Sequence, residues 1–207
     1  MKNTAIILGN GDSRKDINYR KLWPDAVVYG CNGAYREDVD RLVCVDVYMQ
    51  HLIYESGYCI HNWCYFNQWD PLPKEVVKPI AQSFGLPVIA NDGTNKACVR
   101  GTDKFVYVTW VEDYDEIRSI PDIEISSGSR ALLLAAESGE YDKIILLGFD
   151  GITGSNIYIN TSGYENSEPR SHWEQERQNI MDRFPDIKFT YENNNNASKI
   201  KTKSGTN

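Results

Sequence analysis

Thr4-Ala-Ile-Ile-Leu8, followed directly by Gly9-Asn-Gly-Asp-Ser13, is the stretch of this chain that decides its fold. The apolar, β-branched run predicts a buried strand. The two glycines of the next loop let the backbone approach a ligand closely, and the loop's short polar side chains can hydrogen-bond a ligand or cap the next segment. A buried strand that ends in such a loop is typical of nucleotide sites in α/β folds, although a plain glycine turn explains these residues equally well.

Three further apolar runs also end in small or polar residues. They are Ala26-Val-Val-Tyr29 before Gly30-Cys-Asn-Gly33, Leu42-Val-Cys-Val45 before Asp46, and Lys143-Ile-Ile-Leu-Leu147 before Gly148-Phe-Asp150. Because the carboxyl ends of parallel strands meet at the same edge of a sheet, we expect these loops to lie close together.

A helix is predicted just before the last of these strands. Ser126-Ser-Gly128 is a helix start signal, the apolar run 131–136 follows it, and Gly139 stops it. A helix followed by an unbroken apolar strand is half of a βαβ unit and implies a parallel sheet. The sequence therefore predicts an α/β protein, with a single Rossmann-like domain over 1–192, a mainly parallel sheet and helices on both faces.

The remaining segments are less regular. We expect helices near 75–84 and 173–183, strands at 105–111 and 188–190, and an aromatic, irregular segment at 58–69. Residues 151–170 are polar and rich in turn formers, which indicates a lid or binding loop. The polar stretch 193–207 predicts a disordered tail.

Composition restricts the function classes. The 207 residues carry a formal net charge of −7, which argues against a nucleic-acid partner because such a partner requires a basic face. No apolar run has the length of a membrane span. The five cysteines include no CxxC pair and no signal peptide precedes them, so we expect reduced thiols and a cytoplasmic protein. A homo-oligomer is compatible with these data.

Individual residues suggest nucleotide chemistry. The helix start at Ser126, Ser127 and Gly128 offers unpaired N–H groups that suit a phosphate. Asp46 and Asp150 can accept hydrogen bonds from a ribose or a base, although an aspartate after a strand is more often a helix cap.

A second pair of aspartates, Asp113 and Asp115, suggests a metal site. Asp113-Tyr-Asp115 follows a predicted strand and could hold Mg²⁺ against a diphosphate. Because Glu112 and Glu116 flank the pair, a solvated acidic turn explains it as well.

The order of these motifs resembles a known family. GNG-x-S, a strand ending in Cys-Asn, an SSG helix start and a strand ending in Gly-Phe-Asp resemble the family 42 sialyltransferases of bacterial surface-glycan synthesis over roughly residues 4–180. The chain is also similar to proteins that carry the GNGPS motif, of which the archaeal hydroxymethylpterin diphosphokinases are distant relatives. The resemblance implies a Rossmann-like domain with a lid and CMP-sialic acid as the donor, with no required metal.

The resemblance also implies roles for particular residues. Asn10 and Ser13, next to Gly9 and Gly11, would hold the donor phosphate and ribose, and Asn32 would meet the donor sugar or phosphate. Asp46 would face the nucleotide. Ser127 and Gly128 would line the carboxylate or phosphate site beside Ser126, and Gly148 and Asp150 would bracket the cytidine.

The resemblance assigns catalytic roles to two further residues. Tyr158 would stabilise the leaving phosphate. His172 would be the general base that deprotonates an acceptor hydroxyl, although it also suits the first turn of a helix.

Three positions depart from the family pattern and leave the function open. Glu124 stands near the position of a basic residue, Asp12 replaces a proline, and Ile152 replaces a second lid tyrosine. The prediction is thus a glycosyltransferase that moves a sugar from a cytidine nucleotide-sugar to a glycan or small-molecule hydroxyl with inversion. The alternatives are a nucleotide-binding module without catalysis, or a Mg²⁺-dependent diphosphokinase on the same fold.

Overall fold

The chain forms two compact units in the computed structural model. Unit 1 comprises Met1–Val43 and Glu124–Asn207, and unit 2 comprises Cys44–Ile123. The structure describes residues 3–83, 85, 95–101, 106–151, 155–164 and 172–193.

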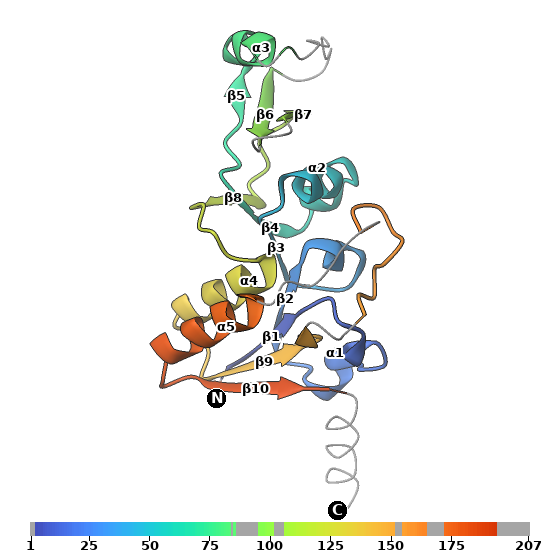
Figure 1. Ribbon diagram of the computed structural model, residues 1–207, viewed down its shortest axis with the longest axis vertical. Helices are drawn as coiled ribbons and strands as arrows, with labels where there is room; N and C mark the ends of the chain where they lie inside the picture. The colour runs from blue at the N-terminus through green and yellow to red at the C-terminus, as the bar shows by residue number, and fades with distance from the viewer. Residues whose placement is uncertain are drawn as a thin grey trace, which may run out of the picture. The chain divides into compact units, whose positions relative to one another are not determined.

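Unit 1 is built on parallel strands in the order β10-β9-β1-β2-β3 (Figure 1). Their bounds are β1 Thr4–Leu8, β2 Val27–Cys31, β3 Arg41–Cys44, β9 Lys143–Leu147 and β10 Lys188–Glu192. In the register of the central strands, Ile6 lies opposite Val28 on one side and Ile145 on the other. The predicted α/β class with a mainly parallel sheet is confirmed, and the fold is Rossmann-like.

The apolar runs form these strands because they are buried on both faces. Ile6, Ile7, Leu8, Ile144 and Leu147 all have no exposed surface. A strand with no polar face is stable only when both sides of the sheet are covered.

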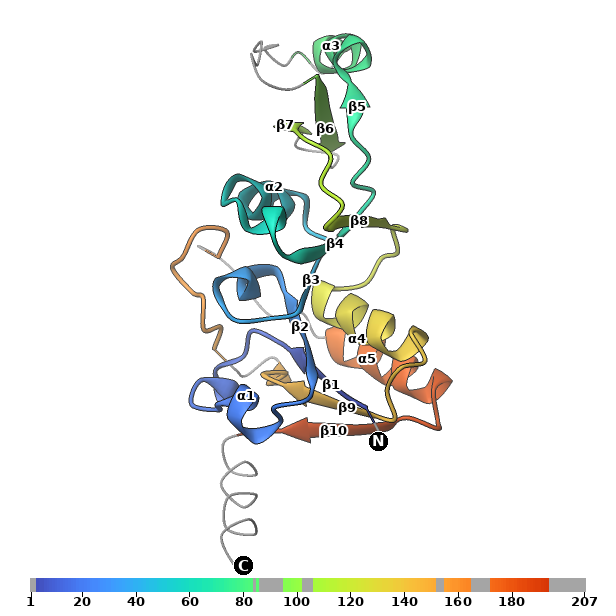
Figure 2. The same cartoon turned by 180° about the vertical axis from the view of Figure 1, so that it is seen from behind.

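Two helices of unit 1 lie side by side in both views (Figures 1 and 2). Helix α4, Ser127–Glu137, packs on β1 and β2, and helix α5, His172–Arg183, packs against α4. Shorter elements complete the unit: the 3-10 turns Asp12–Arg14 and Asn32–Arg36 and helix α1, Tyr19–Leu22. The two long helices begin within one residue of the predicted starts.

Unit 2 combines a parallel pair of strands with a small antiparallel sheet. Strand β4, Trp63–Asn67, pairs in parallel with β8, Ile117–Ile120. The antiparallel sheet has the order β5-β6-β7, from Leu72–Pro73, Lys96–Gly101 and Val106–Val111. Helices α2, Val47–Glu55, and α3, Lys74–Ser83, belong to the same unit.

The prediction for residues 58–69 is wrong. The structure has a 3-10 turn at Tyr58–Ile60 and then strand β4. In β4, Cys64 and Phe66 are fully buried while Trp63 is exposed. The segment therefore has the period of a strand, which the density of aromatic residues concealed.

The expected lid is described at residues 151 and 155–164, while Ile152 and residues 165–171 lie outside the described residues. The expected tail also lies outside them beyond residue 193. Among the described helices, none is long and apolar enough to cross a membrane. All five cysteines are buried free thiols.

Candidate functional site

The loops after β1 and β9 meet at the carboxyl edge of the sheet in unit 1. The Gly9 amide donates to Leu147 O at 2.7 Å, and the Gly11 amide donates to Gly148 O at 2.8 Å. A Cβ on Gly9 would lie 2.4 Å from Gly148 O, and Gly148 itself has a φ of +71°. The approach of the two loops therefore depends on glycine at these positions, and the prediction that they converge is confirmed.

Ser13 and Asp150 form the polar contact between the same two loops. The Ser13 amide donates to Asp150 Oδ2 at 2.9 Å, and Ser13 Oγ donates to Asp150 Oδ1. A Cβ on Gly11 would lie 2.4 Å from Asp150 Oδ2. The carboxylate thus binds the turn that begins at Asp12, and both predicted residues lie at the loop contact.

Asn32 connects the end of β2 to the start of helix α4. Asn32 follows β2 directly with a φ of +47°, a left-handed conformation that asparagine tolerates. Its Oδ1 accepts a hydrogen bond from Ser127 Oγ at 2.7 Å. A Cβ on Gly128 would lie 2.9 Å from Phe149 Cε1, so the start of α4 also contacts the loop after β9.

The N-terminus of α4 is capped as the sequence predicts. Ser126 is the N-cap, and its hydroxyl accepts from the Ser129 amide. Glu176 of helix α5 also binds Ser126, because its Oε2 accepts from the Ser126 amide at 3.0 Å and from Ser126 Oγ at 2.9 Å. No pattern in the sequence indicates this role for Glu176, since the contact joins residues that lie fifty positions apart.

The described part of the expected lid is attached to the Gly9–Ser13 loop through its backbone. The Asp12 amide donates to Ser155 O at 2.9 Å, and the Ile157 amide donates to Asn10 O at 2.9 Å. A bridge between Gly11 and Asn156 lies between these two bonds. Residues 155–164 therefore lie against the first loop, where a lid for a site at this edge belongs.

Tyr158 is buried in a charged network under this segment. Its hydroxyl donates to Glu37 Oε1 and accepts from Arg14 Nη2 at 3.1 Å. Arg14 also makes two 2.8 Å bonds to the Glu37 carboxylate and donates from Nε to Gly9 O at 2.5 Å. Burial, together with the hydrogen bond to Glu37, raises the pKa of Tyr158 well above its ordinary value although the Arg14 charge opposes this. The hydroxyl therefore remains protonated.

Tyr164 is a residue of the site that the sequence did not reveal. Its hydroxyl accepts from Asn10 Nδ2 at 2.8 Å and from the Gly33 amide at 3.0 Å, so it joins the loops after β1 and β2. Its ring lies 5.6 Å from that of Tyr158. Only the position of the residue in a tyrosine-containing lid segment could have indicated it.

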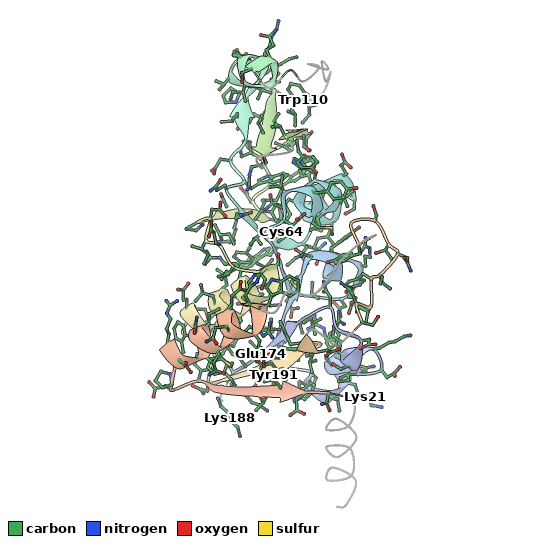
Figure 3. All side chains as sticks on the ribbon, in the orientation of Figure 1. Lys21, Cys64, Trp110, Glu174, Lys188 and Tyr191 are labelled. Atoms are coloured by element: carbon green, nitrogen blue, oxygen red, sulfur yellow. The ribbon has the colours of Figure 1, made fainter. Side chains whose placement is uncertain are left out.

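Arg177 brings a second buried cation to this region. It lies on α5, is 5% exposed, and its guanidinium lies 4.8 Å from the centre of the Phe149 ring. Its Nε is 3.5 Å from the hydroxyl of Tyr191, which Figure 3 shows on β10. The helical pattern alone could not distinguish this arginine from a solvated one.

His172 is the first residue of α5 and its side chain is 58% exposed. Its Nε2 lies 3.6 Å from Glu176 Oε1. Because Glu176 binds Ser126, the histidine is connected through one carboxylate to the N-cap of α4.

Three other predicted residues, Asp46, Asp113 and Asp115, belong to unit 2. Asp46 is the N-cap of α2, and its side chain accepts from the Met49 amide at 2.8 Å. Asp113 forms an ion pair with Lys96, and Asp115 is exposed. The described residues contain no group of three or more His, Cys, Asp or Glu side chains that could hold a metal ion. Exposed Glu124 is the first residue of the second segment of unit 1.

Comparison of the chain with protein-family models, with curated proteins and with solved structures found no match.

The geometry defines the chemistry that unit 1 can perform. Glycine loops, a serine hydroxyl and the start of a helix meet at one sheet edge, and the positive dipole end of α4 favours an anion there. The carboxylate of Asp150 and the amide of Asn32 add acceptors for hydroxyl or amine groups.

Proposed function

We propose that unit 1 binds a cytidine nucleotide-sugar and transfers its sugar to a hydroxyl acceptor with inversion. The observation that supports this most directly is the convergence of Gly9–Ser13, Asn32, Ser127–Gly128 and Gly148–Asp150, joined by the contacts above. The motif order that resembles the family 42 sialyltransferases supports the same reaction. The proposed setting is the cytoplasm, because all five cysteines are free thiols.

The donor phosphate belongs at the start of α4. Ser127 and Gly128 occupy the first turn of this helix, where the positive end of the helix dipole favours an anion. The Oδ1 atom of Asn32 accepts from Ser127 Oγ at 2.7 Å. The NH₂ group of the same amide can therefore donate to the phosphate. Asn10, Ser13 and Asp150 then face the ribose and the base.

A CMP-sugar carries a single phosphate, so the phosphate bound at the start of α4 is also the leaving group, and the resemblance assigns its stabilisation to the Tyr158 hydroxyl. A phosphate oxygen that reaches this hydroxyl also comes near the Arg14 guanidinium, which lies 3.1 Å from it. The Tyr158 hydroxyl must then donate to the phosphate in place of Glu37, to which it donates in the free protein. A hydroxyl and a cation together can stabilise the negative charge that develops as the bond to the sugar breaks. His172 then accepts the proton of the attacking acceptor hydroxyl. This reaction has no step that requires a metal ion.

Thermal unfolding in the presence of nucleotides tests the binding step. A ligand at 100 times its Kd stabilises the native state by about 2.7 kcal/mol, which in a chain of this size raises Tm by roughly 5 °C or more. We expect this rise with CMP or a CMP-sugar, and a smaller one with UMP or ATP. The proposal fails if no cytidine nucleotide raises Tm.

Two serines at opposite ends of α4, Ser127 and the C-cap Ser138, provide a matched pair of variants. Ser127→Ala removes the hydroxyl that binds Asn32 and should weaken CMP binding. Ser138→Ala removes a hydroxyl at the other end of the helix, where it bonds Ala135 O at 2.8 Å, and should leave binding unchanged.

Transfer is tested by the release of CMP from a CMP-sugar in the presence of hydroxyl acceptors. His172→Ala should retain CMP binding and lose about 10²- to 10⁴-fold in kcat, the usual contribution of a general base. Binding without transfer in the wild-type chain would identify a nucleotide-binding module instead, and turnover of ATP that requires Mg²⁺ would identify a diphosphokinase.

A further inference from the structure

The carboxylate of Glu176 is shared between the start of α5 and the start of α4. Its side chain is 12% exposed. Oε2 accepts two hydrogen bonds from Ser126, at 3.0 Å from the amide and 2.9 Å from Oγ. Oε1 lies 3.6 Å from His172 Nε2. The two bonds to Ser126 fix the carboxylate, so its second oxygen presents a fixed negative charge to the histidine.

We infer that Glu176 is a positioning residue, which holds His172 with its proton on Nε2 and leaves Nδ1 as the atom that accepts a proton from the substrate. The inference rests on the proposed function, because it assigns the base atom of that reaction. In a neutral imidazole, the hydrogen bond made by one ring nitrogen determines which nitrogen carries the proton. A carboxylate is only an acceptor, and therefore it selects the Nε2–H form.

The position of the carboxylate also suits a histidine that takes a proton during the reaction. The carboxylate one turn later, at i+4 on the same face, stabilises the positive charge that His172 acquires when it takes a proton. The 3.6 Å contact is within ion-pair range but beyond hydrogen-bond distance, and we expect it to shorten to a hydrogen bond when the substrate binds.

The Glu176 carboxylate contacts both His172, the proposed base, and the start of α4, where the proposed donor binds. Ser126 is the N-cap of α4 and precedes Ser127 and Gly128, where the proposed phosphate binds. Helices α4 and α5 lie side by side in both views of the ribbon (Figures 1 and 2). A shift of the first turn of α4 would therefore move the carboxylate that orients His172.

Glu176→Gln is the variant that tests this assignment, because it changes the group that faces the histidine and retains the contact with α4. The Ser126 amide can only donate, so the amide oxygen of the glutamine must face it. The NH₂ group then faces His172 Nε2, which must become an acceptor, and the proton moves to Nδ1.

Glu174→Gln is the matched control. Glu174 is an exposed carboxylate in the first turn of the same helix (Figure 3), and its replacement makes the same change in charge. It takes no part in the contacts with Ser126 and His172 described above.

The first measurement is the nitrogen-15 NMR spectrum of the His172 ring at alkaline pH, where imidazoles are neutral, assigned by its loss in His172→Ala. We expect the Nε2–H form in the wild-type chain and in Glu174→Gln, and the Nδ1–H form in Glu176→Gln. The assignment is overturned if the wild-type ring has its proton on Nδ1, or if Glu176→Gln leaves the ring unchanged.

The second measurement is a double-mutant cycle on transfer activity. Glu176→Gln should lower kcat roughly tenfold or more, within the range that a general base contributes, and leave the KM for the donor unchanged. In a His172→Ala background the same change should have no effect, since it acts through the histidine. An equal loss in both backgrounds would mean that Glu176 acts only through the fold and would overturn the inference. If the NMR result holds but no cytidine nucleotide-sugar is turned over, the proposed function fails while the contact between Glu176 and His172 stands.

Discussion

At the scale of single residues, the charge of Arg14 organises the edge of the sheet in unit 1. The side chain is 4% exposed, and it binds Glu37, Tyr158 and the carbonyl of Gly9. Burial by itself would raise the pKa of Glu37, but the hydrogen bond and charge of Arg14 outweigh it and hold that pKa below its ordinary value. The pair is therefore ionised at neutral pH and, through Tyr158, helps to keep residues 155–164 against the first loop.

Replacement of Arg14 should be costly for this reason. Arg14→Met leaves the half-buried Glu37 carboxylate without its cation, and breaking a buried pair in this way typically costs about 3–5 kcal/mol. We expect a loss of about 3 kcal/mol in the free energy of unfolding, measured by urea denaturation. Arg20→Met is the control, because Arg20 pairs with the exposed carboxylates of Asp38 and Asp40 and such pairs contribute only about 0–1 kcal/mol. Equal losses in both variants would contradict this account.

At the scale of secondary-structure elements, Asp46 shows how one residue type suits two roles. The sequence places it after an apolar strand, where it suits either a ligand contact or a helix cap. In the structure its side chain caps α2 by accepting from the Met49 amide at 2.8 Å. The aspartate therefore has a structural role whether or not it also meets a nucleotide.

Two substitutions of Asp46 separate these roles. Asp46→Ala removes the cap and should lower the free energy of unfolding by about 1 kcal/mol, whereas Asp46→Asn preserves a good cap and should leave it nearly unchanged. CMP affinity, measured by calorimetry, should be the same in Asp46→Asn and in the wild-type chain. A large loss of affinity in Asp46→Asn with normal stability would show that the carboxylate contacts the ligand.

The elements that the sequence predicted well share a local cause. Residues 4–8 and 143–147 are unbroken apolar runs, and Ser126 and Gly139 bound α4, so each signal is contained within the element itself. Helix α2 and strand β4 were missed because their burial depends on partners elsewhere in unit 2. Strand β4, for example, pairs with β8, which lies far along the chain and places Phe66 opposite Ser119.

At the scale of the whole molecule, the pH dependence of stability should include a contribution from His51. This residue of α2 is 4% exposed, its Nδ1 contacts Thr109 Oγ1, and its Nε2 has no partner among the described residues. Burial, with the nearby charge of Arg100, lowers its pKa from 6.5 to about 4. Between these two pH values the imidazole is neutral in the folded chain and protonated in the unfolded chain.

The direction of the effect follows from proton linkage. Between pH 6.5 and about 4 the unfolded state binds more protons than the folded state, so stability decreases as the pH falls through this range. The shift is equivalent to at most about 3 kcal/mol. In His51→Gln, Tm should decrease less between pH 7 and pH 4.5 than in the wild-type chain. Parallel curves for the two proteins would show that His51 does not contribute.

The sequence alone determined the α/β class, the buried central strands of unit 1 and the loops at their carboxyl ends, because hydrophobic runs, glycines and cap residues act over a few neighbouring positions. Tertiary structure alone decided which polar groups meet. Ser13 binds Asp150, Asn32 binds Ser127, and Glu176 binds Ser126. Each of these pairs depends on how strands and helices distant in the chain are brought together, and hydrogen bonds form only over about 3 Å. No periodicity or spacing in the sequence contains that information.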